Sequence, residues 1–155
     1  MEYLGKNTSL LYLFTPQVIV NGVVDGNGAG GKTEFMDLVS RARSMHKGVD
    51  WHIYLDANDT DIGIDSDCAE AESHDILLVI YRAGEEVVKA GKGPNKGKKL
   101  KHANIAKQVR KIGEWKGGDL TMALPAPKSS MPQGEEAAVL VQADAGGPIV
   151  AAAKI

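Results

Sequence analysis

The chain has 155 residues, of which 43% are hydrophobic and 25% are charged, a composition that suits one ordinary globular protein. Its net charge of −2 argues against a generally basic nucleic-acid binder, and its one cysteine, Cys68, excludes an intrachain disulfide and a thiolate metal cluster. The four histidines lack zinc-ligand spacing, the N-terminus lacks the features of a secretory signal, and no run reaches the roughly 20 apolar residues of a membrane span. We therefore expect a soluble, cytoplasmic protein without a metal site or a membrane partner.

The first predicted elements are a hairpin and a helix. Asn21-Gly22 separates the runs QVIV and VVDG, and Asn-Gly at such a position is the strongest short-range hairpin signal because both turn residues need a positive φ. The stretch TEFMDLVSRAR then places Phe35, Leu38 and Val39 at helical spacing and ends in basic residues. It predicts a helix with Thr33 as its N-cap.

From about residue 49 the chain has the pattern of short strands. The predicted strands are VDWHIYLDA, DILLVIYR, EEVVKA, GDLTMALPA, EEAAVLVQAD and PIVAAAKI, with a turn at Ala83-Gly84. Residues 100–115 fit either a helix or a strand, and both remain open. Trp51 and Trp115 are expected to anchor the core. Many short strands with turns between them predict an antiparallel sandwich, with a domain boundary near residues 45–49.

Residues 26–33, GNGAGGKT, fit the phosphate-binding pattern G-x-x-x-x-G-K-[ST] at Gly26, Gly31, Lys32 and Thr33. A genuine phosphate loop joins a buried parallel strand to a helix. Here the preceding strand is the second arm of a tight hairpin, and no β-α alternation follows residue 75. We therefore interpret GNGAGGKT as a glycine-rich connection and expect no cofactor. The alternative is a nucleotide-binding protein that uses a phosphate loop at residues 26–33.

Two later segments carry opposite charge. Residues 50–75 hold nine acidic residues and no Lys or Arg, and they lack the Gly and Glu positions of a calcium loop, so they predict a solvated acidic loop. Residues 89–116 hold ten Lys or Arg and one Glu. This Lys-rich segment fits a solvated ribbon, a partner for the acidic stretch within the molecule or across a dimer, or, as a further alternative function, nucleic-acid binding. The sequence shows no Ser-His-Asp or Cys-His arrangement.

Three stretches in order, LFTPQVIVNG, VVKAGKGPNKGKKLKHANIAKQVRKIGEWKG and AVLVQADAGGPIVAAAKI, resemble the family catalogued as domain of unknown function 1223. Its members resemble secreted or periplasmic bacterial proteins with an N-terminal thioredoxin-like domain and a β-rich C-terminal domain. The resemblance implies that Thr15 and Pro16 occupy the thioredoxin proline-loop position, where the proline is typically cis. It also implies that the chain starts after the half of that domain with the Cys-x-x-Cys pair. Thiol–disulfide exchange needs two thiols and is not expected here.

Together these features predict an α+β fold. A partial thioredoxin-like hairpin plus helix, residues 1–47, packs on a C-terminal antiparallel β-sandwich, residues 48–155. The predicted function is that of a non-enzymatic small binding or interaction protein of unknown ligand. An unpaired hairpin edge recruits another chain unless it is blocked. We therefore expect either that SLLYLF, residues 9–14, supplies a substitute strand, or that two copies pair their hairpins and helices into a homodimer.

Overall fold

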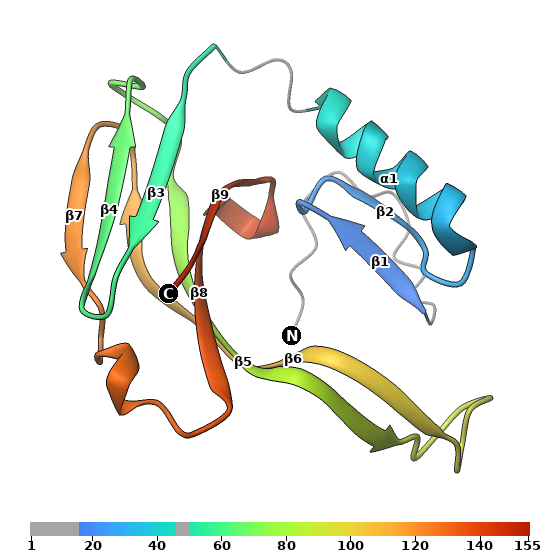
Figure 1. Cartoon of the computed structure of the whole chain (residues 1–155). Coiled ribbons are helices and arrows are strands. Elements are labelled where there is room, and N and C mark those ends of the chain that lie inside the picture. Colours follow the sequence, from blue (N-terminus) through green and yellow to red (C-terminus); the bar gives the residue numbers. More distant parts are fainter. Residues whose placement is uncertain (1–15, 46–49) are drawn as a thin grey trace.

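The computed structural model describes residues 16–45 and 50–155 and contains one α-helix among strands that all pair antiparallel, which confirms the α+β class (Figure 1). The elements are β1 (Gln17–Val20), β2 (Val24–Asn27), α1 (Gly31–Met45), β3 (Ile53–Ala57), β4 (Asp61–Ser66), β5 (His74–Lys89), β6 (Lys99–Trp115), β7 (Leu120–Ala123), β8 (Glu135–Ala143) and β9 (Ile149–Lys154).

Two of the sheets form a sandwich. One has the strand order β3-β4-β7 and the other β6-β5-β8-β9, and their apolar faces share one core. Ile62 and Ile64 enter it from β4, and Ile76, Val139 and Val141 enter it from β5 and β8, all at most 3% exposed. Alternation of buried and exposed residues along these strands is what a half-buried sheet requires.

The long strands β5 and β6 settle the open assignment of residues 100–115, which are strand throughout. The expected turn at Ala83-Gly84 is wrong, because β5 continues to Lys89. The register passes from Arg82↔Ile105 to Glu85↔Ala103, so Ala83-Gly84 forms a bulge, in which extra residues bend a strand without ending it. Pairing of β5 with β8 stops at Arg82. Beyond it the β5–β6 hairpin, residues 83–105, extends alone as an arm (Figure 1).

Two further expectations are corrected. Residues 61–66 are not a solvated acidic loop but strand β4, in which Asp61 and Asp65 alternate with the buried Ile62 and Ile64. Thr33 is not an N-cap, because α1 begins two residues earlier, at Gly31.

The hairpin and the helix form a smaller unit. β1 pairs with β2 across Asn21 and Gly22, whose φ values are 51° and 71°, so the hairpin prediction is confirmed. Leu38 and Ala42 of α1 pack on Val24 of β2 in a cluster separate from the sandwich core. The thioredoxin-like character of this unit stays a prediction, and the predicted boundary at residues 47 and 48 lies outside the described residues.

The turn of the hairpin contacts the sandwich directly. The Ile149 N–H donates to the Asn21 carbonyl at 2.8 Å. A Cβ atom built on Gly22 would lie 2.6 Å from the Gly147 carbonyl oxygen. Only glycine fits here, because the backbone is left-handed and the β8–β9 turn lies against it.

Candidate functional site

The stretch GNGAGGKT runs from β2 through a short turn into α1. Gly26 lies in β2, Gly31 is the first residue of α1, and Lys32 and Thr33 follow it in the first helical turn, where all three are exposed. The strand before the turn is one arm of a two-stranded antiparallel sheet. Because a phosphate loop follows a parallel strand inside a sheet, this position favours a glycine-rich connection over a nucleotide site.

Two backbone donors of the turn already have acceptors within the chain. The Gly28 N–H donates to the Pro16 carbonyl at 2.8 Å, and the Ala29 N–H donates to Asn27 Oδ1 at 2.9 Å. A Cβ built on Gly30 would lie 1.3 Å from Glu34 Oε2, so the Glu34 carboxylate covers this glycine beside the start of α1. An anion is stabilised at a helix N-terminus, and here that anion is the protein's own carboxylate, which repels a phosphate.

Packing accounts for two of the glycines in the stretch. A Cβ on Gly26 would lie 2.7 Å from a Leu38 methyl group, and one on Gly28 would lie 2.9 Å from a Val18 methyl group. Glycine is therefore needed where α1 and β1 approach the loop backbone. The nucleotide site at Gly26, Gly31, Lys32 and Thr33 stays an untested alternative, and the geometry supplies a structural reason for the motif without it.

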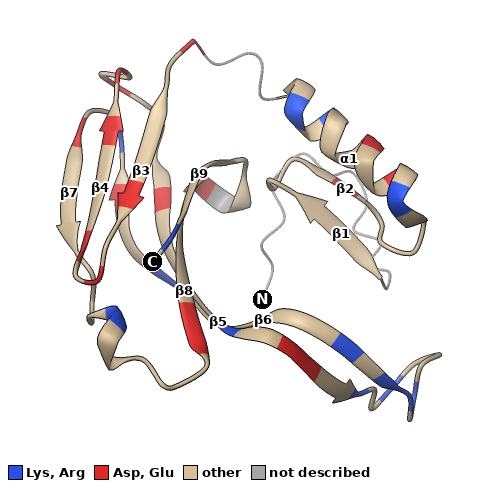
Figure 2. Ribbon diagram, viewed as in Figure 1, with Lys and Arg blue, Asp and Glu red and all other residues tan. Residues whose placement is uncertain are grey.

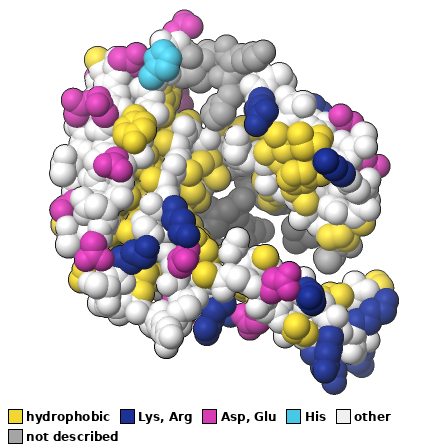
Figure 3. Space-filling view, viewed as in Figure 1, with side chains coloured by type: hydrophobic (Ala, Val, Ile, Leu, Met, Phe, Trp, Pro, Cys, Tyr) yellow, Lys and Arg dark blue, Asp and Glu magenta, His cyan; other side chains and the backbone are white. Residues whose placement is uncertain are grey.

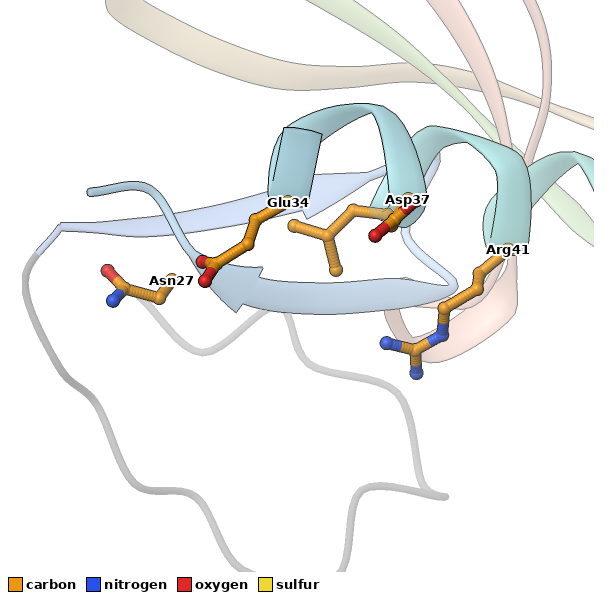
Figure 4. A pocket seen from close by; sticks show the side chains of 5 residues that line it. Asn27, Glu34, Asp37 and Arg41 are labelled. Atoms are coloured by element: carbon orange, nitrogen blue, oxygen red, sulfur yellow. The ribbon is translucent and has the colours of Figure 1, made fainter. Parts of the chain in front are cut away.

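A cavity of about 270 Å³ lies beside α1 and is lined by Asn27, Glu34, Asp37, Leu38 and Arg41. Figure 4 shows Glu34 extending from the helix towards Asn27, while Arg41 extends from a later turn of the same helix. The lining offers two carboxylates, one guanidinium and one amide for hydrogen bonding. It contains no Ser, Cys, His or Lys that could act as a nucleophile.

The proline-loop position is only partly within the described chain. Pro16 is exposed and its carbonyl accepts the Gly28 N–H, whereas Thr15 and the predicted substitute strand at residues 9–14 lie outside the described residues. Cys68 is buried in the sandwich core, and its thiol donates to the Glu70 carbonyl at 3.2 Å. The chain's one thiol is therefore part of the sandwich core, enclosed by apolar residues.

The apolar side of α1 is wider than the hairpin that covers it. Leu38 and Ala42 are at most 7% exposed, whereas Phe35 and Met36 are each 47% exposed and Met45 is 63% exposed. We call the last three residues the α1 apolar strip. Figure 3 shows hydrophobic side chains gathered over α1 and the adjoining hairpin, with Lys or Arg on either side.

The charged segments take definite places in the fold. Across the described parts of the chain, no three His, Cys, Asp or Glu side chains come together as a metal-binding group. Asp67 lies beside His52, whose backbone N–H donates to it at 2.6 Å; this bond, and then the one to the His52 ring, lowers the pKa of Asp67. The Lys-rich segment, residues 89–116, occupies the end of the arm and all of β6. It therefore spans both a projecting tip and part of the sandwich.

One polar cluster was not visible in the sequence because its members are far apart in the chain. Tyr81 on β5 donates its hydroxyl to Glu136 on β8 at 2.9 Å, and Lys154 on β9 pairs with the same carboxylate. Burial, and then the Glu136 hydrogen bond, raises the pKa of Tyr81. The Lys154 hydrogen bond lowers the pKa of Glu136 and itself raises the pKa of Lys154. The strand register brings these residues together, and the cluster holds three adjacent strands in place.

Within residues 16–45 and 50–155, no helix combines the length and the apolarity that crossing a membrane requires.

Comparisons with known proteins agree with this geometry. The model of the family described as Protein of unknown function (DUF1223) matches residues 2–142. Over 92% of its length the chain is similar to the X-ray crystal structure of a protein from Agrobacterium tumefaciens, with a TM-score of 0.60 and 25% identity. The chain spans 62% of that protein. A search of curated proteins gives no match.

Proposed function

We propose that this chain, which belongs to the DUF1223 family, is a non-enzymatic interaction protein that binds a second copy of itself through α1 and β1. The observation that carries the proposal is the α1 apolar strip of Phe35, Met36 and Met45, which the hairpin leaves uncovered. At about 100° per residue, Phe35 and Met45 lie on the two margins of the buried face formed by Leu38 and Ala42, and Met36 lies beyond Phe35. Exposed apolar side chains at the margins of a buried face can contact a partner.

The edge of β1 supports a second copy as the partner. Among the described residues, β1 has β2 as its one neighbouring strand, and Ile19 on β1 is 48% exposed. An open edge presents backbone N–H and carbonyl groups to another strand. A two-fold axis beside β1 would pair the two copies of this strand antiparallel, so that the same patch serves both partners.

The size of the apolar strip predicts weak association. Burying a half-exposed Phe or Met side chain contributes about 1 kcal/mol, so the strips of two copies contribute about 6 kcal/mol. Association costs about 4–15 kcal/mol, because the two molecules lose translational and rotational freedom. The backbone hydrogen bonds of the β1 edge, worth about 1 kcal/mol each, must supply the remainder. With about four such bonds and a cost at the low end of that range, the net free energy is about −6 kcal/mol. We therefore expect a dimer that dissociates at about tens of micromolar.

The non-enzymatic part of the proposal draws on the same region. The cavity beside α1 is lined by no Ser, Cys, His or Lys. The chain has one cysteine, and that cysteine is enclosed in the sandwich core, so the two-thiol chemistry of thioredoxin-like proteins has no basis here. These features support binding rather than catalysis.

A charge placed on the strip tests the proposal. Phe35→Glu puts a carboxylate in the contact and is expected to abolish the dimer in sedimentation velocity at about 0.5 M salt, which screens contacts between exposed charges, because a buried unpaired charge is strongly unfavourable. Ser40→Glu is the matched control, since it adds the same charge at an exposed polar position of the same helix. A wild-type protein that stays monomeric at about 500 μM in the same salt, roughly ten times the expected constant, would contradict the proposal. The proposal would also be contradicted if Phe35→Glu and Ser40→Glu changed the dissociation constant of the dimer to the same extent.

A further inference from the structure

His52 pairs with Asp67 beside β3. The other ion pairs of the described chain lie on β5, β6, β8 and β9 and on Lys116, just after β6. They join Lys101 to Glu85, Lys107 to Glu86, Lys111 to Asp75 and Glu114, Lys116 to Glu114, and Lys154 to Glu136. Four of the ten basic side chains of the Lys-rich segment, those of Lys101, Lys107, Lys111 and Lys116, are therefore paired with acidic side chains of the same chain. Many other charges make no ion pair in the described chain, and two places hold several of one sign.

The first place is the end of the arm. Its lysines are exposed and make no ion pair with any acid of the described chain. We call this set, Lys89, Lys92, Lys96, Lys98 and Lys99, the basic tip. Lys89 lies directly opposite Lys99 in the register, and like charges at such a pair destabilise a hairpin. An anion that binds here would relieve this repulsion.

The second place is the outer side of the β3–β4 pair and the loop after it. Exposed carboxylates there make no ion pair with any Lys or Arg of the described chain. We call this set, Asp56, Asp65, Asp67, Glu70 and Glu72, the acidic face. Tyr54 lies opposite Asp65 in the register and is 68% exposed. An exposed tyrosine among charged residues is a common anchor of protein interfaces.

The two sets are far apart in one molecule. Figure 2 shows the ribbon of β3 and β4 coloured red at Asp and Glu positions, and the ribbon near the far end of the arm, on the opposite side of the molecule, coloured blue at Lys and Arg positions. A rigid sheet separates them, because β5 runs through the sandwich and into the arm. The basic tip therefore cannot reach the acidic face of its own chain.

We infer that the basic tip binds the acidic face of a second copy of this chain. Five exposed cations match five exposed carboxylates. Within the described chain the tip lysines make no ion pair, and among the face carboxylates only Asp67 has an ion-pair partner, His52. A reciprocal pair, in which each copy contributes one tip and one face, neutralises both sets and closes on itself. This contact depends on charge alone and is independent of the proposed α1 contact. Because all of its charges are exposed, added salt screens it.

Charge reversal gives a test with its own internal control. The tip variant replaces every lysine of the basic tip with glutamate: Lys89→Glu, Lys92→Glu, Lys96→Glu, Lys98→Glu and Lys99→Glu. The face variant replaces every carboxylate of the acidic face with lysine: Asp56→Lys, Asp65→Lys, Asp67→Lys, Glu70→Lys and Glu72→Lys. Both are made in the Phe35→Glu background, so that the result does not depend on the proposed α1 contact. All substituted positions are exposed, and circular dichroism verifies that each variant folds.

Sedimentation velocity, first at low salt, measures association of these proteins, and the Phe35→Glu protein without further changes is the background. The background protein associates with itself, and its dissociation constant rises by about tenfold or more when salt reaches about 0.5 M. Each variant alone is monomeric, because like charges then meet at both contacts. An equimolar mixture of the two associates again, because both contacts regain opposite charges.

Two results would overturn the inference. One is a background protein that remains monomeric at low salt, and the other is a mixture that does not associate although each variant is folded. If the basic tip instead binds duplex DNA or phosphatidylglycerol vesicles while the mixture stays monomeric, the partner is a phosphate-bearing polymer or surface and not a second copy.

Discussion

Trp115 offers the sharpest test of the sandwich core. It is 1% exposed, its indole N–H donates to the Gly118 carbonyl at 2.8 Å, and its ring lies 5.6 Å from Trp51 and 5.3 Å from His74. Trp115→Phe removes two buried ring carbons, worth about 1.6 kcal/mol, and one hydrogen bond, worth about 1 kcal/mol. The free energy of unfolding should fall by about 2.5 kcal/mol, which lowers the unfolding temperature by roughly 5–10 °C in a chain of this size.

The assay is thermal unfolding followed by far-ultraviolet circular dichroism. Trp51→Phe is the matched control, because Trp51 is only half-buried and no hydrogen bond to its indole is found among the described residues. It should shift the unfolding temperature by less than half as much. Equal shifts for the two variants would refute the conclusion that Trp115 is the buried anchor with a partner for its indole N–H.

Three further predictions concern other parts of the fold. Gly22→Ala should lower the unfolding temperature and speed hydrogen exchange at the turn, because it costs about 1–2 kcal/mol in a left-handed conformation and meets the Gly147 carbonyl; unchanged exchange would contradict the contact. Glu136→Gln should make stability less sensitive to acid. The Lys154 hydrogen bond lowers the pKa of Glu136 in the folded protein. The ionised Glu136 carboxylate therefore stabilises the fold fully above its ordinary pKa of about 4.3, and this stabilisation is lost as the pH falls through the lowered pKa of the folded protein. Unfolding temperatures that fall equally in both proteins between neutral and acid pH would contradict this. Mg-ATP and Mg-GTP should not raise the unfolding temperature of the wild-type protein relative to Lys32→Ala. If residues 26–33 did bind nucleotide, nucleotide at 100 times its dissociation constant would add about 2.7 kcal/mol to the free energy of unfolding.

The parts of the fold that follow local backbone rules could be predicted from the sequence. Asn21-Gly22 forms the expected hairpin because its two residues adopt the positive φ that the turn needs. The helix after it was recognised because its apolar residues recur at helical spacing. Its start was misplaced because Gly31, with φ of 82°, is an unusual first residue and Thr33 is a typical N-cap.

The errors arose where tertiary context decides. Residues 61–66 looked like a charged loop, because sequence shows charge without showing which side of a strand carries it. In the structure the charges point outward and the isoleucines point into the core. Ala83-Gly84 looked like a turn, because a glycine at a bulge and a glycine at a turn are alike in sequence. Pairing with β6 across the bulge keeps β5 continuous.

The candidate surfaces could be predicted only in part. The acidic and Lys-rich segments were evident from composition, and so was their possible pairing across a dimer. Which lysines are free depends on register, since Lys107 lies near Glu86 only because β5 and β6 pair along their whole length. The α1 apolar strip could not be separated from the buried face, because Phe35 and Leu38 share one helical stripe and only the position of the hairpin distinguishes them.

The most direct test of the central claim is hydrogen exchange of the wild-type protein at two concentrations, one well below and one well above the dissociation constant, in salt high enough to screen the charged contact. We predict that the amides of β1, residues 17–20, exchange more slowly at the higher concentration, together with those around Phe35 and Met36. Exchange rates in these segments that do not depend on concentration would contradict the claim that this chain acts by binding a second copy through α1 and β1.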